Sequence, residues 1–265
     1  MSKLQDLVNL DRYPLEGPSD QKSAEFAQHC RRQYLQQGVL LLDDFLTPFG
    51  LETMAAEARS AAPKSYCKIK QHTVYLAKQD PGFAEEHPRF RQLITNNSTV
   101  ADCDIQSDAA LRRLYDSPEI RQFFATVTGK PGLYPYTDPL SPLNLGVTGD
   151  GESLSWHFDN SDFAITLLLQ SAESGGAFEY VPRIRSDEEH NYPAIEQLLN
   201  GDQSSTLTLH MHPGTLVLFQ GRYSIHRVTR VHGNQDRLLA VLSYDEQPGQ
   251  RMSEFTQRTF YGRSA

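Results

Sequence analysis

The stretch SWHFDNSDFAITLLLQ, residues 155–170, shows most directly which fold this chain adopts. Polar and apolar residues alternate in it before a short apolar run, which is typical of β-strands buried on one or both faces. Similar short segments, separated by Gly, Pro, Asn and Asp, continue to Tyr244. The predicted strands are Leu143–Val147, Leu154–Asn160, Phe163–Gln170, Ala177–Val181, Thr206–His212, Thr215–Phe219, Ile225–Val231 and Arg237–Tyr244. A jelly roll needs roughly eight short strands, so we predict a double-stranded β-helix.

The residues before this β-rich part have helical periodicity instead. Apolar or small residues recur every three or four positions over Ser19–Gln37, and Gly38 follows as a stop signal. Two further helices are predicted over Thr47–Ala61 and Pro118–Val127. A short buried strand is predicted over Val39–Leu42. The first half of the chain is therefore expected to be mainly helical.

These elements predict one α+β domain with a mainly β, cupin-like core. A mainly helical N-terminal part, residues 1–130, should pack on the barrel and cover it. The catalytic core should span residues 131–250, with a polar insert at 183–205 that holds a helix around Tyr192–Leu199. The C-terminal segment, residues 251–265, is expected to close the pocket.

Charge and cysteine content exclude several classes of partner and site. The formal net charge is −8, from 25 basic and 33 acidic residues, so phosphate backbones and anionic lipids should be repelled. We expect a small-molecule substrate, with neither nucleic acid nor a membrane as partner; no prediction is made about the oligomeric state. The sequence has no signal-peptide pattern and no long apolar stretch, so a cytoplasmic location is expected. The three cysteines, Cys30, Cys67 and Cys103, lie far apart in the sequence and should be reduced thiols.

Three residues have the chemistry of a metal site. His157 and Asp159 stand two residues apart in a predicted strand, so their side chains should point to the same face. His226 follows the buried segment Thr215–Phe219 and would supply a third ligand from another strand. Two histidines and one carboxylate leave three metal positions free, which suits an iron(II) that binds a bidentate 2-oxo acid and dioxygen. We predict that these three residues are catalytic metal ligands.

Arg237 begins an apolar strand, where burying an unpaired guanidinium would be costly. A planar guanidinium can hold a carboxylate through two parallel hydrogen bonds, so the distal carboxylate of 2-oxoglutarate would satisfy it. An ion pair with an acidic core residue such as Asp245 is the alternative. We predict that Arg237 anchors 2-oxoglutarate. The hydroxyl of Thr166 is a second candidate ligand of this cosubstrate, although a β-branched residue in a strand is equally suited to packing.

The strings WHFDNSDFAITLLLQ, GGAFEYVPRIRS, PGTLVLFQGRYSIHRVTRV and DRLLAVLSYD together carry a family resemblance. They resemble the 2-oxoglutarate/iron(II) oxygenases, in the group that contains the free-amino-acid radical halogenases and their hydroxylase relatives. The resemblance covers residues 130–250 strongly and the helical first half weakly. It implies a double-stranded β-helix, with iron on His157, Asp159 and His226 and 2-oxoglutarate on Arg237. The implied cofactors are Fe(II), 2-oxoglutarate as cosubstrate, and O2.

One position distinguishes this sequence from the halogenases that it resembles. Those enzymes have a small residue in place of the acidic ligand, which leaves room for chloride on iron, whereas this chain has Asp159. We therefore predict an oxidoreductase, a dioxygenase that hydroxylates an unactivated C–H of a small polar molecule, such as a free amino acid or a derivative. The resembled lysine halogenases have a further histidine where this chain has Leu154, so lysine is not carried over as the substrate.

Two alternatives stay open at this point. The chain could be a radical halogenase despite Asp159. It could also be a non-catalytic, cupin-like module that binds a metal or 2-oxoglutarate, with His210 and His212 joining His226 as ligands. Against this second reading, His210 and His212 alternate with leucines on what should be an outward polar strand face.

Five further residues are weaker candidates for substrate contacts. Arg183 and Arg185 follow a predicted strand and could reach a substrate carboxylate, although exposed arginines are usually only solvated. Asn160 stands beside the acidic ligand, and His72 lies in the covering half. Tyr261 near the C-terminus would close the pocket, as an aromatic residue does in the resembled halogenases, with core packing as its alternative.

Overall fold

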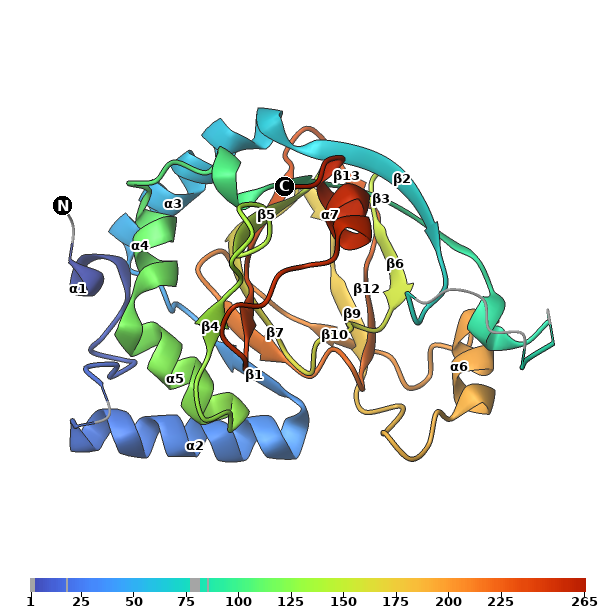
Figure 1. The fold of residues 1–265 in the computed structure, drawn as a ribbon, viewed down its shortest axis with the longest axis horizontal. Helices are drawn as coiled ribbons and strands as arrows, with labels where there is room; N and C mark the ends of the chain where they lie inside the picture. The colour runs from blue at the N-terminus through green and yellow to red at the C-terminus, as the bar shows by residue number, and fades with distance from the viewer. Residues whose placement is uncertain (1–2, 18, 77–81, 85) are drawn as a thin grey trace.

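Two antiparallel sheets form the centre of the molecule in the computed structural model, which describes residues 3–17, 19–76, 82–84 and 86–265 (Figure 1). The large sheet has seven strands in the order β1-β11-β7-β14-β5-β3-β2, and the small sheet has four in the order β10-β9-β12-β6. The strands of the large sheet are β1 (Val39–Leu42), β2 (Tyr66–His72), β3 (Leu93–Val100), β5 (Leu143–Thr148), β7 (Ala164–Gln170), β11 (Leu216–Phe219) and β14 (Arg237–Leu242). Those of the small sheet are β6 (Leu154–His157), β9 (Phe178–Val181), β10 (Leu207–Leu209) and β12 (Ile225–Val228).

Short strand pairs and helices complete the fold. Strand β4 (Tyr134–Pro135) pairs with β15 (Tyr244–Asp245), and β8 (Ser174–Gly175) pairs with β13 (Val231–His232). The helices are α1 (Leu4–Leu7), α2 (Gln21–Gln37), α3 (Pro48–Ala61), α4 (Ala110–Asp116), α5 (Pro118–Thr128), α6 (Tyr192–Leu199) and α7 (Glu254–Tyr261), with short 3-10 turns at Ala62–Lys64, Pro88–Phe90 and Asp102–Asp104. Within the described residues, none of these helices is long and apolar enough to cross a membrane.

The largest helix, α2, ends at the predicted residue and begins two residues after the predicted Ser19. The side chain of Asp20 accepts a hydrogen bond from the Ser23 amide at 2.7 Å, which satisfies one of the free amides of the first turn. Gly38 ends the helix in the left-handed conformation, with φ of 76°. Strand β1 follows at once and occupies the predicted residues.

The helices α1 to α5 lie on one side of the large sheet, and α6 lies beyond the small sheet (Figure 1). Ile165 and Leu167 of β7, with Leu238 and Ala240 of β14, join the large buried cluster under the first group of helices. Side chains alternate between the two faces of a strand, so the intervening residues, among them Thr166, face the space between the sheets. The large sheet thus separates an apolar core from an inner, more polar space.

The two sheets join along one edge. The backbones of Asn96 in β3 and Ser153, just before β6, exchange hydrogen bonds of 3.1 and 3.0 Å. With the solved structures compared below, this arrangement confirms the predicted double-stranded β-helix. Strands β2 and β3 were not predicted, because their sequences YCKIKQH and LITNNSTV mix polar residues into both faces and give little period-two contrast.

Candidate metal centre

Two histidines meet on neighbouring strands of the small sheet. Strands β6 and β12 pair antiparallel with His157 directly opposite His226, so both side chains stand on the same face. Both are buried, and their ring centroids lie 4.1 Å apart. Trp156, which neighbours His157 in β6, points to the other face and joins the cluster under α6. The predicted direction of His157, opposite to that of Trp156, therefore matches the structure.

Asp159 reaches the histidines from a loop. The predicted strand Leu154–Asn160 ends at His157 in the structure. The chain beyond it is fixed by two backbone hydrogen bonds, from the Phe158 amide to the Val74 carbonyl at 2.7 Å and from the Asp159 amide to the Gly221 carbonyl at 3.0 Å. Backbone anchoring, rather than strand alternation, holds the carboxylate in place.

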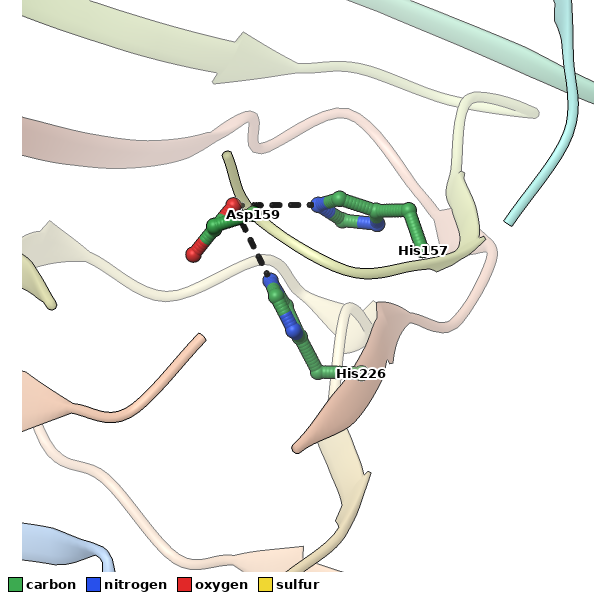
Figure 2. A group of neighbouring side chains, drawn as sticks. All are labelled: His157, Asp159 and His226. Carbon is green, nitrogen blue, oxygen red and sulfur yellow. Dashed lines mark ion pairs between the residues drawn. The ribbon is translucent and has the colours of Figure 1, made fainter. Parts of the chain in front are cut away.

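The three side chains converge on one point (Figure 2). Oδ1 of Asp159 lies 3.8 Å from Nε2 of His157 and 3.7 Å from Nε2 of His226, while the other carboxylate oxygen points away. The ligand atoms of these three residues all lie within 4.8 Å of one another. No other group of this kind occurs in the part of the chain that the structure describes. The arrangement fits one metal ion.

Hydrogen bonds fix which nitrogen of each imidazole is free. Nδ1 of His157 lies 2.8 Å from the Ser155 carbonyl oxygen, and Nδ1 of His226 lies 3.0 Å from that of Ser224. A carbonyl only accepts, so each Nδ1 carries the proton and each Nε2 offers a lone pair toward the cluster. Burial holds the pKa of His157 well below its ordinary value, and the neighbouring His226 lowers it further. His157 is thus neutral at neutral pH, as a metal ligand must be.

Arg237 lies at the start of β14, buried with only 4% of its surface exposed. Burial lowers its pKa to about 10, so the guanidinium remains charged at neutral pH. Its Nη2 has no hydrogen-bond partner, and no ion pair of Arg237 occurs among the described residues. Asp245, the alternative partner, instead accepts hydrogen bonds from Tyr136 and the Gln247 amide. A buried guanidinium that has no acidic partner fits an anionic ligand.

Thr166 and His72 also lie toward the inner space. Thr166 is half-buried in β7, on the face opposite the apolar core. His72 ends β2, and its ring centroid lies 6.3 Å from that of His157. Both of its ring nitrogens are engaged, Nδ1 with the Thr73 carbonyl at 3.0 Å and Nε2 with the Thr95 hydroxyl at 2.7 Å. His72 therefore stands beside the metal ligands with a fixed orientation.

Arg183 and Arg185, predicted to contact the substrate, lie away from the metal cluster, and their substrate role stays a prediction. Arg183 donates to backbone carbonyls at the end of α2, among them Leu35, so it fastens the insert to that helix. The guanidinium of Arg185 lies 3.9 Å from the ring centroid of Phe158, which belongs to the cluster under α6, on the outer face of the small sheet. Both arginines line a surface cavity of about 410 Å³ that no metal-cluster residue lines.

The remaining candidates lie in different surroundings. Asn160 is exposed beside Asp159 and stays a prediction. Tyr261 is buried with Ala101 and Leu140, and burial raises the pKa of its phenol. These contacts pack α7 onto the body, and no contact to the metal cluster or Arg237 is found for Tyr261 in the described ranges. His210 and His212 are both exposed and outside the metal cluster, contrary to the cupin-like alternative.

Gly221, whose carbonyl accepts a hydrogen bond from the Asp159 amide, was not predicted from the sequence. It precedes the strand of His226 in the string FQGRYSIH, and a glycine there is indistinguishable from an ordinary turn residue. Phe178 and Phe219, whose ring centroids lie 5.5 and 5.0 Å from that of His226, were not predicted either. Both look like ordinary strand residues in the sequence.

A double-stranded β-helix that holds a His-Asp-His cluster and a buried arginine has the architecture of the 2-oxoglutarate/iron(II) oxygenases. The chain belongs to the Halogenase D family, whose model matches residues 22–261. The oxygenase class and the group resemblance predicted from the sequence are therefore confirmed. No curated protein matches the sequence.

Solved structures with the same fold include two proteins of nogalamycin biosynthesis and a prolyl-4-hydroxylase. The non-haem α-ketoglutarate-dependent carbocyclase SnoK from nogalamycin biosynthesis is 16% identical, with a TM-score of 0.58 over 90% of this chain and 92% of that chain. The epimerase SnoN from the same biosynthesis is 15% identical, with a TM-score of 0.55 over 83% and 81%; another SnoN structure contains Fe3+ and α-ketoglutarate. A prolyl-4-hydroxylase from Pseudomonas putida is 14% identical, with a TM-score of 0.50 over 81% and 96%. At these identities the likeness shows the fold.

Proposed function

We propose that the protein is an Fe(II)- and 2-oxoglutarate-dependent dioxygenase that hydroxylates a small polar molecule. In this proposal His157, Asp159 and His226 hold the iron, and Arg237 binds the distal carboxylate of 2-oxoglutarate, with Thr166 as a further contact. The free Nε2 atoms and the unpartnered Nη2 of Arg237 support these assignments. Bound iron would activate dioxygen with electrons from the oxidative decarboxylation of 2-oxoglutarate to succinate.

The observation that carries the choice of hydroxylation is the carboxylate of Asp159. Its Oδ1 lies within 3.8 Å of both Nε2 atoms, in the position of a third protein ligand. A position filled by a carboxylate is closed to halide, so one atom of dioxygen would be transferred to the substrate carbon. A free amino acid or a close derivative is the first expected substrate, on the basis of the family resemblance.

The experiment begins with binding. Anaerobic addition of Fe(II) and 2-oxoglutarate should produce the visible metal-to-ligand charge-transfer band, and His157→Ala should remove it. Aerobic reactions with a panel of amino acids and cell extract are then analysed by mass spectrometry for one added oxygen and for succinate. Absence of the band in the unmodified protein would refute the proposal. A band without any succinate formation would favour the non-catalytic binding module instead, whereas succinate formed even without substrate would count against that module.

A radical halogenase is the second candidate, because the family itself is named for halogenation. Reactions with chloride distinguish the two, since chlorinated product from the unmodified protein would show that Asp159 does not exclude halide. We expect hydroxylated product only. The variant Asp159→Gly should abolish hydroxylation and retain weaker iron binding by the two histidines. Full hydroxylation by this variant would show that Asp159 is not a ligand.

A further inference from the structure

The loop that joins β11 to β12, residues 220–224, contacts Asp159 through Gly221. This glycine is buried, and its carbonyl accepts the Asp159 amide at 3.0 Å. A Cβ placed on Gly221 would lie 1.8 Å from Oδ2 of Asp159, 2.6 Å from its Cγ and 2.9 Å from its Cβ. Carbon and oxygen atoms that are not bonded to each other cannot approach this closely. The missing side chain at position 221 therefore makes the room that the carboxylate occupies.

The loop has little freedom to retreat from a larger residue. The Gln220 amide donates to the Gly38 carbonyl at 2.9 Å, which ties the start of the loop to the end of α2. Arg222 donates to the backbone carbonyl of Asn160 at 2.7 Å and forms an ion pair with Asp162 at 2.9 Å. These contacts hold the loop against the same segment that carries Asp159. A side chain at position 221 would thus move the carboxylate before it moved the backbone.

Backbone conformation does not explain the glycine. Gly221 is not among the glycines with positive φ, so alanine could adopt its backbone angles without strain. The obstacle to a side chain at this position is therefore the space taken by Asp159. The consequence is local: Oδ2 is held on the loop side, and Oδ1 is left facing the two imidazoles (Figure 2).

We propose that Gly221 is a positioning residue of the metal centre, which confines the Asp159 carboxylate to the orientation needed for metal binding. This inference rests on the proposed function, because it takes Asp159 to be a metal ligand. Gly221→Ala should displace the carboxylate and weaken metal binding about 10- to 100-fold, the usual effect of losing a group that orients a ligand.

Cobalt(II) titration of the purified protein, followed by visible absorption, tests this without turnover. The variants are Gly221→Ala, Asp159→Gly and the double variant, with Gly132→Ala as the matched control. At Gly132 the atoms nearest to an added Cβ belong to the side chain of Tyr134, the first at 3.2 Å, and Tyr134 is an exposed residue that can move aside. We expect unchanged affinity for Gly132→Ala and a loss for Gly221→Ala.

The double variant gives the decisive comparison. Once Asp159 has no side chain, alanine at 221 has nothing to displace, so the double variant should bind cobalt as Asp159→Gly does, within about twofold. A further loss in the double variant would show that position 221 acts through the fold, and would overturn the inference. Wild-type affinity in Gly221→Ala would also overturn it, while leaving the proposed function intact. Failure of the unmodified protein to bind cobalt would refute both.

Discussion

The metal cluster and Arg237 are polar sites buried in facing sheets, and the chain supports them in opposite ways. In the cluster, each histidine is fixed through Nδ1 by a backbone carbonyl and Asp159 through its amide, which leaves the ligand atoms directed at one point. Arg237 has no such support among the residues that the structure describes, since its Nη2 is buried there without a partner and β14 offers it no acid.

This difference indicates what each region lacks. The cluster holds uncharged Nε2 lone pairs and one carboxylate, so it requires a cation. Arg237 holds a buried positive charge, so it requires an anion. A metal ion together with a dianionic 2-oxo acid would satisfy both regions at once, whereas either ligand alone would leave one of them unsatisfied. The two regions should therefore respond differently to the removal of a side chain.

The largest effect is expected at the metal cluster. His226→Ala removes one of the three proposed ligands, so the affinity for Fe(II) should fall by two orders of magnitude or more, since losing even a group behind a ligand costs about 10–100-fold. The charge-transfer band with 2-oxoglutarate measures this. His212→Ala is the matched control, because His212 is exposed and outside the cluster, and it should retain the band. Equal loss in both variants would contradict the assignment of His226.

Removal of Arg237 should affect the cosubstrate and spare the metal. Losing a buried charged hydrogen-bond partner costs about 2–5 kcal/mol, so Arg237→Ala should weaken 2-oxoglutarate binding by roughly 30- to 5000-fold. Titration of the charge-transfer band with 2-oxoglutarate gives this value, and cobalt(II) affinity should stay within about twofold. The exposed Arg230→Ala serves as the control. A parallel loss of metal and cosubstrate affinity would mean that the two regions are not separate.

Replacement of Arg237 should weaken 2-oxoglutarate binding, but it should stabilise the fold of the ligand-free protein. Its folded pKa of about 10 lies below its ordinary value, so the buried charge destabilises the fold below pH 10, and this penalty is lost as the pH rises through the folded pKa toward the ordinary value. Arg237→Met should therefore raise the free energy of unfolding at pH 7 by about 1–3 kcal/mol. Urea denaturation measures this. Added 2-oxoglutarate with metal should stabilise the wild type more than it stabilises the variant. If the ligand-free variant were less stable than the wild type, Arg237 would have a partner in the fold.

The sequence predicted these two regions well because each depends on local pattern. His157 and Asp159 stand two residues apart, at the end of a strand and just beyond it, and Arg237 begins an apolar run. Residue type and local spacing therefore single them out. The pairing of His157 with His226 could not be predicted from spacing alone, since it depends on how β6 and β12 pair across the chain.

What the sequence did not predict depends on long-range packing. Arg183 and Arg185 follow a strand, as a residue at a barrel mouth would, yet contacts with α2 and Phe158 draw them to other faces. Strands β2 and β3 are polar on both faces, and they form because β5 offers β3 an edge to pair with. Gly221 is important only because Asp159 lies against it.

The smallest effect on 2-oxoglutarate affinity is expected at Thr166. Thr166 lies in β7 on the inner face, where it pairs with Val241 of β14, four residues along that strand from Arg237. If its hydroxyl donates one neutral hydrogen bond to 2-oxoglutarate, Thr166→Val should cost about 1 kcal/mol, which is a roughly fivefold weaker affinity in the charge-transfer titration. Valine keeps the branched shape, so packing is preserved and metal affinity should not change. Thr166→Ser retains the hydroxyl and should keep most of the 2-oxoglutarate affinity. The opposite order, with serine weaker than valine, would mean that Thr166 contributes packing alone and that Arg237 binds the distal carboxylate without it.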